Sequence, residues 1–285
     1  MWTRKPFGAD PLRAIRAAQF AARLEFAIAP ETMALCRTLD LGGLARERVM
    51  GEMEKALTRS GRPSRCFEAL REMGQLEPWL KEVAALIGVK QRADCHPEGD
   101  AWTHTMLVVD EAAKLRDEAK NPTGLMLAAL LHDVGKAVAM QEKDGVIHAY
   151  GHETAGVPLA EDFLRRLTEE KALCRYVLNM VELHMKPNMY AAQNSGQKAW
   201  NRLFDRSACP EDLLLLAKAD HRGRPNAAPY AETERMIRTR LSAFEEVMAR
   251  PHITGADLLA RGKFSRGEEM GAVARRSAPA QAGRG

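Results

Sequence analysis

The chain has 285 residues, 46% of them hydrophobic, which is enough for one large domain or two helical modules, and it contains no apolar run of the roughly 20 residues that a membrane span needs. No signal peptide opens the chain, so we expect a cytoplasmic protein without a membrane partner. The net charge of +4 is unevenly distributed along the chain. The numbers of basic residues (Lys and Arg) and acidic residues (Asp and Glu) are 16 and 11 in residues 1–93, 20 and 25 in residues 94–260, and 6 and 2 in residues 261–285.

A basic front segment followed by an acidic centre fits a nucleotide or nucleic-acid ligand. Positive charge attracts phosphate, and clustered carboxylates hold cations. Differences of about five charges over such lengths are also ordinary variation, so both interpretations stand.

The cysteines predict neither a disulfide framework nor a zinc ribbon. They are odd in number, widely spaced and without a C-x-x-C pair. We expect reduced packing residues at these positions: Cys36, Cys66, Cys95, Cys174 and Cys209.

The periodic segments of the front part have helical spacing, and none shows the sustained alternation of a half-buried strand, so the pattern predicts an all-α fold. The first helix is expected to start with Asp10 as N-cap and Pro11 at the first helical position, and to continue to about Leu24. Further helices are predicted at about 30–38, 43–59, 65–73 and 76–87, followed by a loop from about 88 to 100.

A second helical module is predicted from Ala101, with a helix to about Lys120 and then a core helix that ends at His132. A less regular, glycine-containing stretch follows, and then helices near 154–167, 170–185, 196–206, 210–221 and 231–249. We divide the chain into a front module (1–93), a second module (94–250) and a tail (262–285) whose composition predicts disorder.

The most informative residues are His132 and Asp133, which follow the apolar run Leu125–Leu131. A helix apolar on nearly all sides is a core element, so this pair leaves the core at a rigid position. Neighbouring side chains on a helix diverge by about 100°, so both can face one ion only if it lies off the helix end. The pair therefore favours a divalent metal over a simple hydrogen bond.

Two further residues complete the expected metal site. His104 and Asp220 lie on predicted helices, and imidazole with carboxylate suits Mg, Mn, Ni, Co, Fe or Zn. The predicted ligands are His104, His132, Asp133 and Asp220. An ion held this way would leave room for water or for a phosphate oxygen, and metal-activated water could attack phosphorus.

Three more residues are expected close to this ion. His152 and His184 could hold a second ion or donate to a substrate phosphate, and Lys136 would present an ammonium group to that phosphate. A single histidine is more often a satisfied packing residue than a ligand, so the prediction depends on the whole ordered set.

The pattern His104…His132-Asp133…Asp220 resembles the HD-domain superfamily of metal-dependent phosphohydrolases, and Leu131–Lys136 matches its central motif. A second resemblance covers about residues 6 to 248. It is a resemblance to the neck and body of bacterial tRNA nucleotidyltransferases, the CCA-adding enzymes. The similar segments are Phe7, residues 10–24 and 28–32, Arg46-Glu47-Arg48, Glu52–Lys55, His96–Asp100 and Gly151-His152-Glu153.

This second resemblance implies that Asp10 and Arg13, with Arg16 beside them, bind the base of an incoming nucleotide. A carboxylate can accept from an exocyclic amine, and a guanidinium can donate to ring acceptors. A helix cap and a surface arginine are the alternative roles of the first two residues. Ala9 departs from the family, which has a second acidic residue there.

The catalytic head of that family carries a D-x-D metal pair and an R-R-D segment, and neither occurs in this sequence. We therefore expect that this polypeptide alone does not add CCA. Met1–Lys5, which do not resemble the family, are compatible with a split gene, a late start or a truncated chain whose head is a separate partner.

Three functions remain open from the sequence. The first is an HD-type phosphohydrolase acting on phosphoesters such as 2',3'-cyclic nucleotides or 2'-nucleotides, as the resemblance implies, with a front module that binds RNA or nucleotide. The second is the carboxyl-terminal part of a tRNA nucleotidyltransferase. The third is a non-catalytic helical module that binds tRNA through basic residues of the front module and the tail.

Overall fold

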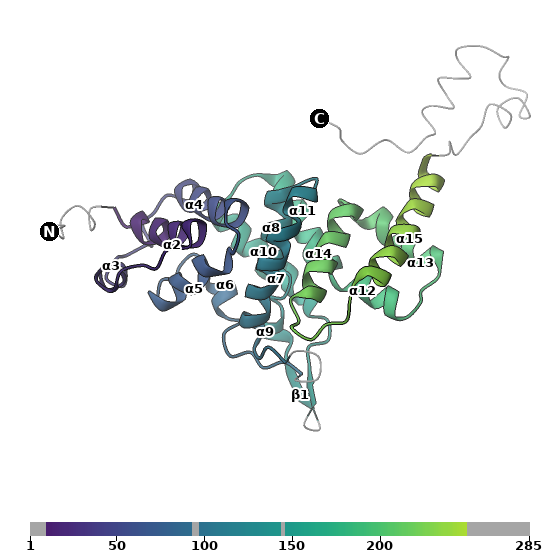
Figure 1. Ribbon diagram of the computed structural model, residues 1–285, viewed down its shortest axis with the longest axis horizontal. Helices are drawn as coiled ribbons and strands as arrows, with labels where there is room; N and C mark the ends of the chain where they lie inside the picture. Colours follow the sequence, from purple (N-terminus) through teal and green to yellow (C-terminus); the bar gives the residue numbers. More distant parts are fainter. Residues whose placement is uncertain (1–9, 93–96, 144–145, 250–285) are drawn as a thin grey trace, which may run out of the picture.

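The computed structural model describes residues 10–92, 97–143 and 146–249, and it is a helical assembly with one small sheet (Figure 1). The all-α expectation is confirmed. The predicted disordered tail (262–285) and Cys95 lie outside the described residues.

The front of the chain folds into short helices at one end of the molecule (Figure 1). They are α2 (Leu12–Leu24), α3 (Pro30–Cys36), α4 (Arg46–Arg59), α5 (Ser64–Glu72) and α6 (Lys81–Ala84). Helix α2 is counted from Leu12, with Pro11 as its N-cap, one residue later than predicted. The side chain of Asp10 still accepts from the Leu12 amide at 3.2 Å, which is the capping role that the sequence predicted.

The longer second part contains the remaining elements. They are α7 (Ala101–Leu115), η1 (Arg116–Glu118), α8 (Pro122–Leu131), α9 (Lys136–Ala139), β1 (Gln141–Lys143), β2 (Val146–His148), α10 (His152–Leu167), α11 (Lys171–Leu183), α12 (Met185–Ala192), α13 (Gln197–Arg206), α14 (Pro210–Arg222) and α15 (Ala231–Ala249).

Helix α8 is the central core element that its composition predicted. Asn121 caps it by accepting from the Gly124 amide at 2.9 Å, and Pro122 occupies its first turn. Every residue from Leu125 to Leu131 is fully buried. The helix packs against α4, α7, α11 and α14, so its carboxyl end is held from several sides.

The sequence missed several short elements. The antiparallel hairpin of β1 and β2 pairs Gln141 with His148 and Glu142 with Ile147, and three-residue strands are too short to show alternation. Its sequence signal is the Asp144-Gly145 dipeptide. Helices α9 and α12 were also not predicted, because α9 spans four residues and α12 carries Pro187 in its first turn.

Several predicted helices have different bounds. The segment predicted as a helix over 76–87 contains only the short α6, because Pro78 lacks the amide hydrogen that a continuous helix needs. The segment predicted over 170–185 ends at Leu183, and His184 joins α11 to α12 with φ −53° and ψ −36°. His184 thus keeps helical backbone angles at the junction of the two helices.

The core is continuous through both parts of the chain. Buried apolar side chains from α2 to α15 form one cluster, which includes Phe67, Leu130 and Trp200. The four cysteines in the described part are free thiols: Cys36, Cys66, Cys174 and Cys209. Burial raises the pKa of the Cys66 thiol to about 12, which fits the predicted packing role.

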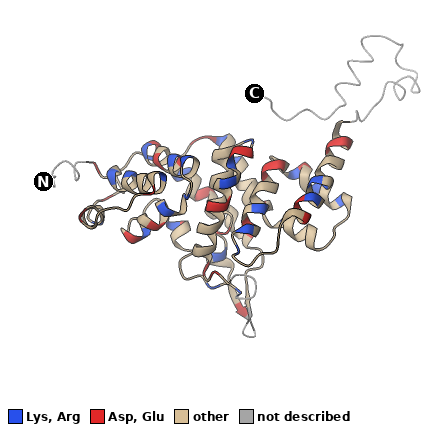
Figure 2. Cartoon of the chain, in the orientation of Figure 1, with Lys and Arg blue, Asp and Glu red and all other residues tan. Residues whose placement is uncertain are grey.

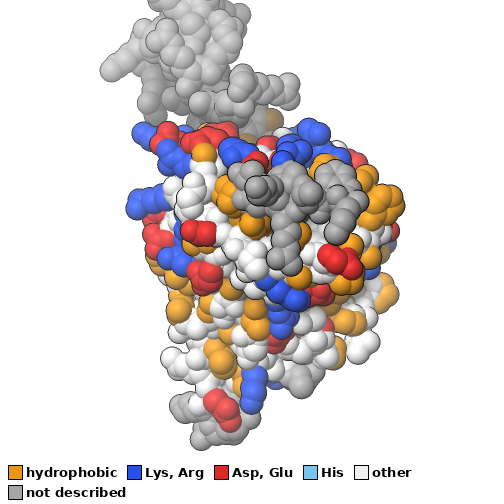
Figure 3. Space-filling model, turned by 90° about the vertical axis from the view of Figure 1, so that its left-hand side faces the viewer, with side chains coloured by type: hydrophobic (Ala, Val, Ile, Leu, Met, Phe, Trp, Pro, Cys, Tyr) orange, Lys and Arg blue, Asp and Glu red, His pale blue; other side chains and the backbone are white. Residues whose placement is uncertain are grey.

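Basic and acidic residues both occur along the front helices (Figure 2). The face turned toward the viewer in Figure 3 also carries hydrophobic side chains between Lys and Arg. Phe20, Leu24 and Phe26 of this region are exposed, and the guanidinium of Arg23 lies 5.0 Å from the centre of the Phe20 ring. No helix in the described residues is long and apolar enough to cross a membrane.

Candidate metal centre

The site begins where α8 ends, and the local fold aims its side chains. His132 is the C-cap of α8 and keeps helical backbone angles, while Asp133 follows it in the turn toward α9. This turn lies tightly against the start of α10. A Cβ atom on Gly135 would lie 2.0 Å from the His152 carbonyl oxygen, so only glycine fits there.

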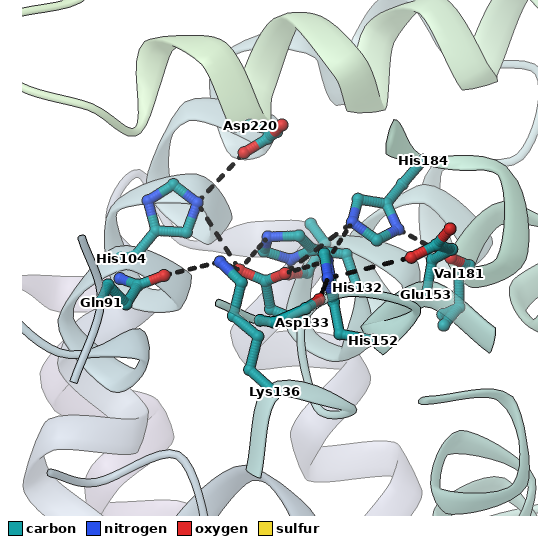
Figure 4. Close-up of polar contacts among 12 residues, drawn as sticks. Gln91, His104, His132, Asp133, Lys136, His152, Glu153, Val181, His184 and Asp220 are labelled. Atoms are coloured by element: carbon teal, nitrogen blue, oxygen red, sulfur yellow. Dashed lines mark hydrogen bonds and ion pairs between the residues drawn. The ribbon is translucent and has the colours of Figure 1, made fainter. Parts of the chain in front are cut away.

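Two groups of side chains that could hold a metal meet at this point (Figure 4). The first group combines His132 with His104 from α7 and Asp220 from α14, and His104 Nε2 lies 3.1 Å from Asp220 Oδ1. All three residues are at most 4% exposed. Helices that are distant in sequence therefore bring the predicted ligands together.

The second group consists of Asp133, His152 from the start of α10 and His184 from the α11–α12 junction. His152 Nε2 lies 3.2 Å from Asp133 Oδ1 and 3.4 Å from His184 Nε2. The sequence analysis placed these two histidines near the ion without choosing between metal and phosphate contacts.

Asp133 lies between the two groups (Figure 4). Its Oδ2 atom is 3.2 Å from His132 Nε2 and 3.8 Å from His104 Nε2, and its Oδ1 atom faces the second group. The sequence analysis assigned Asp133 to the same ion as His104, His132 and Asp220. The geometry gives each carboxylate oxygen a different neighbourhood, so Asp133 can serve both groups.

The tautomers of the histidines suit a metal. The Nδ1 atoms of His132, His152 and His184 lie 2.7 to 2.9 Å from the carbonyl oxygens of Ala129, Ala149 and Val181, each three residues earlier. A carbonyl only accepts, so each Nδ1 carries a proton, and in the neutral imidazole each Nε2 presents a lone pair inward.

This pattern provides a direct test of fit. Two inward lone pairs at 3.4 Å, on His152 and His184, repel each other unless a cation or a proton lies between them. Ligand histidines in metal sites are oriented by the same type of Nδ1 contact. The residues therefore fit a divalent metal, and the described part of the chain contains the His/Asp clusters that could hold it.

Burial disfavours the charge on both carboxyl groups, but their neighbours outweigh it. The charges of His132 and Lys136, with hydrogen bonds from His132 and His152, hold the pKa of Asp133 well below its usual range. For Asp220, the hydrogen bond from His104 and the charge of Arg224 have the same effect on its pKa. Both side chains are anionic at neutral pH and can act as ligands.

The histidines differ in the direction of their pKa shifts. Burial lowers the pKa of His184 to about 3, and the charge of His132 adds to this effect. Burial also acts on His104 and His152, but carboxylate contacts outweigh it and raise their pKa values: Asp220 and Glu98 for His104, and Asp133 for His152.

Lys136 is the first residue of α9, and its side chain points toward Asp133 (Figure 4). Its Nζ atom lies 2.6 Å from Asp133 Oδ2 and donates to Gln91 Oε1 at 2.6 Å. An ammonium group has three donors, so one remains for a phosphate oxygen beside the carboxylate.

Two residues with clear contacts to the site were not predicted. The side chain of Glu98 is 1% exposed and its Oε1 atom lies 2.7 Å from His104 Nδ1, while Arg224 Nη2 lies 3.3 Å from Asp220 Oδ2. The signal for Glu98 was its place in the loop just before the helix of His104. Arg224 follows Asp220 by four residues, which is the spacing of a helical ion pair.

The three residues expected to bind a nucleotide base lie far forward in the chain, at the start of α2. Asp10 Oδ2 accepts from Arg48 at 2.7 Å, and this hydrogen bond is the main reason that its pKa is lowered. Arg16 lies 3.7 Å from Glu52 of α4, and Arg13 occupies the same face one turn earlier. Their nucleotide-binding role stays a prediction.

Two family models match the chain. Residues 101–224 match the HD domain, and residues 25–87 match the probable RNA and SrmB-binding site of polymerase A. The second part of the chain is thus an HD domain, which has the fold of a metal-dependent phosphohydrolase. The two metal-ligand groups lie within the first of these ranges.

Relatives match most of the chain. It is 38% identical over 233 residues to the Multifunctional CCA protein of Actinobacillus pleuropneumoniae serotype 5b (strain L20), covering 76% of this chain and 55% of that protein. The Multifunctional CCA protein of Burkholderia pseudomallei (strain K96243) is 37% identical over 250 residues, covering 83% and 58%. That of Burkholderia cenocepacia (strain HI2424) is 38% identical over 256 residues, covering 85% and 60%.

The chain thus combines the HD domain and the RNA-binding region of a tRNA-nucleotidyltransferase-like protein, as its sequence motifs indicated. It spans little more than half the length of the curated relatives named above, between 55% and 60%.

Proposed function

We propose that the chain is a metal-dependent phosphohydrolase that acts on phosphoesters such as 2',3'-cyclic nucleotides or 2'-nucleotides. The observation that carries this proposal is the convergence of four buried imidazoles on two anionic carboxylates, with three Nδ1 protons directed to carbonyl oxygens. Such a set serves no packing purpose, because buried polar groups are costly unless they are paired or bind a ligand.

In this proposal, one ion is held by His104, His132, Asp133 and Asp220. His152 and His184 hold a second ion together with the other oxygen of Asp133. Once protonated at Nε2, His152 can instead donate to the substrate phosphate, whereas neutral His184, with its proton on Nδ1, cannot. A divalent ion supplies an activated water and positive charge for a phosphoester under attack.

The protein's own contribution is positioning. Lys136 holds the Asp133 carboxylate at 2.6 Å and offers a further N–H to phosphate, while Gln91 fixes the Lys136 side chain. Arg224 holds Asp220 from the opposite side at 3.3 Å. Cationic and metal-ligating groups would then surround a phosphate from several directions.

The test is a double replacement, His132→Ala with Asp133→Ala, assayed on 2',3'-cyclic nucleotides with Mn, Ni or Mg supplied. We expect loss of hydrolysis and a lower metal content in the purified protein. His221→Ala is the matched control: His221 follows Asp220, but its Nε2 lies 2.7 Å from the Ala228 carbonyl oxygen, outside both groups. Unchanged turnover in the double variant would contradict the proposal.

A second proposal concerns the front module. The match of residues 25–87 to an RNA-binding region supports contact with tRNA, and Asp10, Arg13 and Arg16 would take part in nucleotide binding if a nucleotidyltransferase head is supplied as a separate partner. Binding through phosphates should weaken about 10³-fold or more between 50 and 200 mM salt. A tRNA affinity that does not change with salt concentration would exclude binding through phosphates. Binding of tRNA without hydrolysis of any phosphoester would favour a non-catalytic RNA-binding module.

A further inference from the structure

A cavity of about 230 Å³ opens beside the metal-ligand groups, with Asp133, His152 and Asp220 in its wall. Four cationic side chains also line it: Lys90, Arg92, Lys136 and Arg224. These charges suit an anionic ligand whose phosphate lies deep in the cavity, near the carboxylates that would hold the metal.

The same cavity is also lined by Ile147 and His148 of β2 and by Tyr150 in the segment after it. Figure 1 shows the hairpin projecting from the body next to α9. The rings of His148 and Tyr150 are stacked, with centroids 4.9 Å apart and planes inclined by 16°. The tyrosine ring therefore has one face toward an imidazole, and the side chain as a whole remains largely exposed to solvent.

Tyr150 is the most exposed of the large hydrophobic side chains in residues 10–92, 97–143 and 146–249, at 83% compared with 68% for Phe26. An exposed aromatic side chain that lines a charged cavity contributes little to folding. It is well suited to stack on a flat ligand, because aromatic rings prefer parallel offset contacts.

The chain couples this ring to the metal-ligand groups. Tyr150 is followed by Gly151 with φ 73° and then by His152, whose Nδ1 contacts the Ala149 carbonyl oxygen at 2.8 Å. Two residues span at most about 7 Å. The chain therefore keeps Tyr150 close to His152, and both residues line the same cavity.

We propose that His148 and Tyr150 form a stacking platform for a nucleobase, so that the site takes nucleoside phosphoesters in preference to phosphoesters without a base. The inference rests on the proposed hydrolytic function and adds the residues that select its substrate. Stacking is tolerant of base identity, so purine and pyrimidine substrates should both benefit.

The experiment compares Tyr150→Ala with Tyr150→Phe on two substrates, adenosine 2',3'-cyclic phosphate and the base-free ethylene glycol cyclic phosphate. We expect Tyr150→Ala to raise KM for the nucleotide about 5- to 100-fold with kcat nearly unchanged, and to leave the base-free substrate unaffected. Tyr150→Phe, which keeps the ring, should restore the KM. Val138→Ala is the matched control, since Val138 is 64% exposed on α9 but does not line the cavity.

A binding measurement separates failure of this inference from failure of the proposed function. Calorimetry with adenosine 2'-phosphate and with inorganic phosphate reports stacking even if no substrate is turned over. The platform is supported if Tyr150→Ala weakens only the nucleotide. Equal affinity of wild type and Tyr150→Ala for adenosine 2'-phosphate, or equal losses on both ligands, would overturn it.

An RNA oligonucleotide that ends in a 2',3'-cyclic phosphate provides the last comparison. If the platform serves an RNA end, this oligonucleotide should show the lower KM and the larger effect of Tyr150→Ala. If it serves a free nucleotide, the mononucleotide should show both. An effect of Tyr150→Ala on neither substrate would again contradict the platform.

Discussion

At the scale of single residues, the metal centre depends on what lies behind each ligand. His132, His152 and His184 are oriented by carbonyl oxygens three residues earlier, whereas His104 faces the Glu98 carboxylate at 2.7 Å. A carboxylate behind a ligand imidazole fixes its tautomer and raises its basicity. Glu98 is therefore a positioning residue for His104.

Glu98→Ala should lower metal affinity about 10- to 100-fold, because His104 loses the group that orients it. Glu98→Gln keeps an acceptor oxygen and should retain part of the affinity. Calorimetric titration with Mn²⁺ measures both effects. Glu161→Ala on α10 is the control, because the Glu161 side chain is 41% exposed and pairs with Arg165. Equal affinity of Glu98→Ala and wild type would show that the contact has no positioning role.

The raised pKa values of His104 and His152 predict how pH acts on metal binding. Protonation of these two imidazoles stabilises the metal-free protein, and this stabilisation is fully present at pH values below 6.5, the ordinary pKa of histidine. It is lost as pH rises through their raised pKa values. Metal binding requires the neutral imidazole, so it competes with these protons. His184, with its pKa lowered to about 3, is neutral throughout this range.

Mn²⁺ affinity should therefore fall as pH is lowered from about 8 to about 6, with proton release on binding. Calorimetry in two buffers of different ionisation enthalpy measures the released protons. A metal affinity independent of pH would mean that neither histidine is a ligand.

At the scale of elements, the decisive feature is the contact between the α8–α9 turn and the amino end of α10. Gly135 faces backbone atoms of His152 and Gly156, which a Cβ would meet at 2.0 and 2.5 Å. This contact sets the distance between Asp133 in the turn and His152 on the helix. The sequence showed the glycine and predicted the following helix, but it did not show that the two are in contact.

Gly135→Ala should separate α9 from α10, destabilise the protein by about 1–3 kcal/mol or more, and weaken binding at the second metal group. Urea unfolding and Mn²⁺ stoichiometry measure the two consequences. Gly196→Ala is the matched control, because nothing lies within 4 Å of the added Cβ there. Full metal binding by Gly135→Ala would show that the close packing does not position His152.

At the scale of the whole molecule, the front helices and the HD domain share one hydrophobic cluster and several polar contacts. Arg166 of α10 donates to Glu82 of α6 at 2.5 and 3.1 Å and to the Trp79 carbonyl oxygen at 2.8 Å. The Glu82 side chain is only 5% exposed. We therefore propose that the boundary near residue 93 separates functions, while both parts unfold together.

Arg166→Ala should lower the free energy of unfolding by about 3 kcal/mol, because it leaves the Glu82 carboxylate buried without its partner. The neighbouring Arg165, 69% exposed and paired with Glu161, is the matched control, and its replacement should cost less than about 1 kcal/mol. Urea unfolding followed by tryptophan fluorescence gives both values. Two separate transitions in the wild type would contradict the shared unfolding.

The sequence by itself determined the helical class, the core helix α8 and the identity of the ligand candidates. These are local properties: apolar periodicity, the helix start at Asp10-Pro11, and a His-Asp pair at the end of an apolar run. The sequence pattern indicated every residue of the two groups that could hold a metal: His104, His132, Asp133, His152, His184 and Asp220.

Only the tertiary structure decided how these residues are grouped. The two oxygens of Asp133 face different groups, and Glu98 lies behind His104, because segments far apart in sequence pack together. The stacked ring of Tyr150 follows a strand that is too short to show a period in the sequence. Spacing along a chain specifies which face of its own helix a residue occupies. The side chains that it meets are set by the packing of other helices, because contacts between elements are non-local.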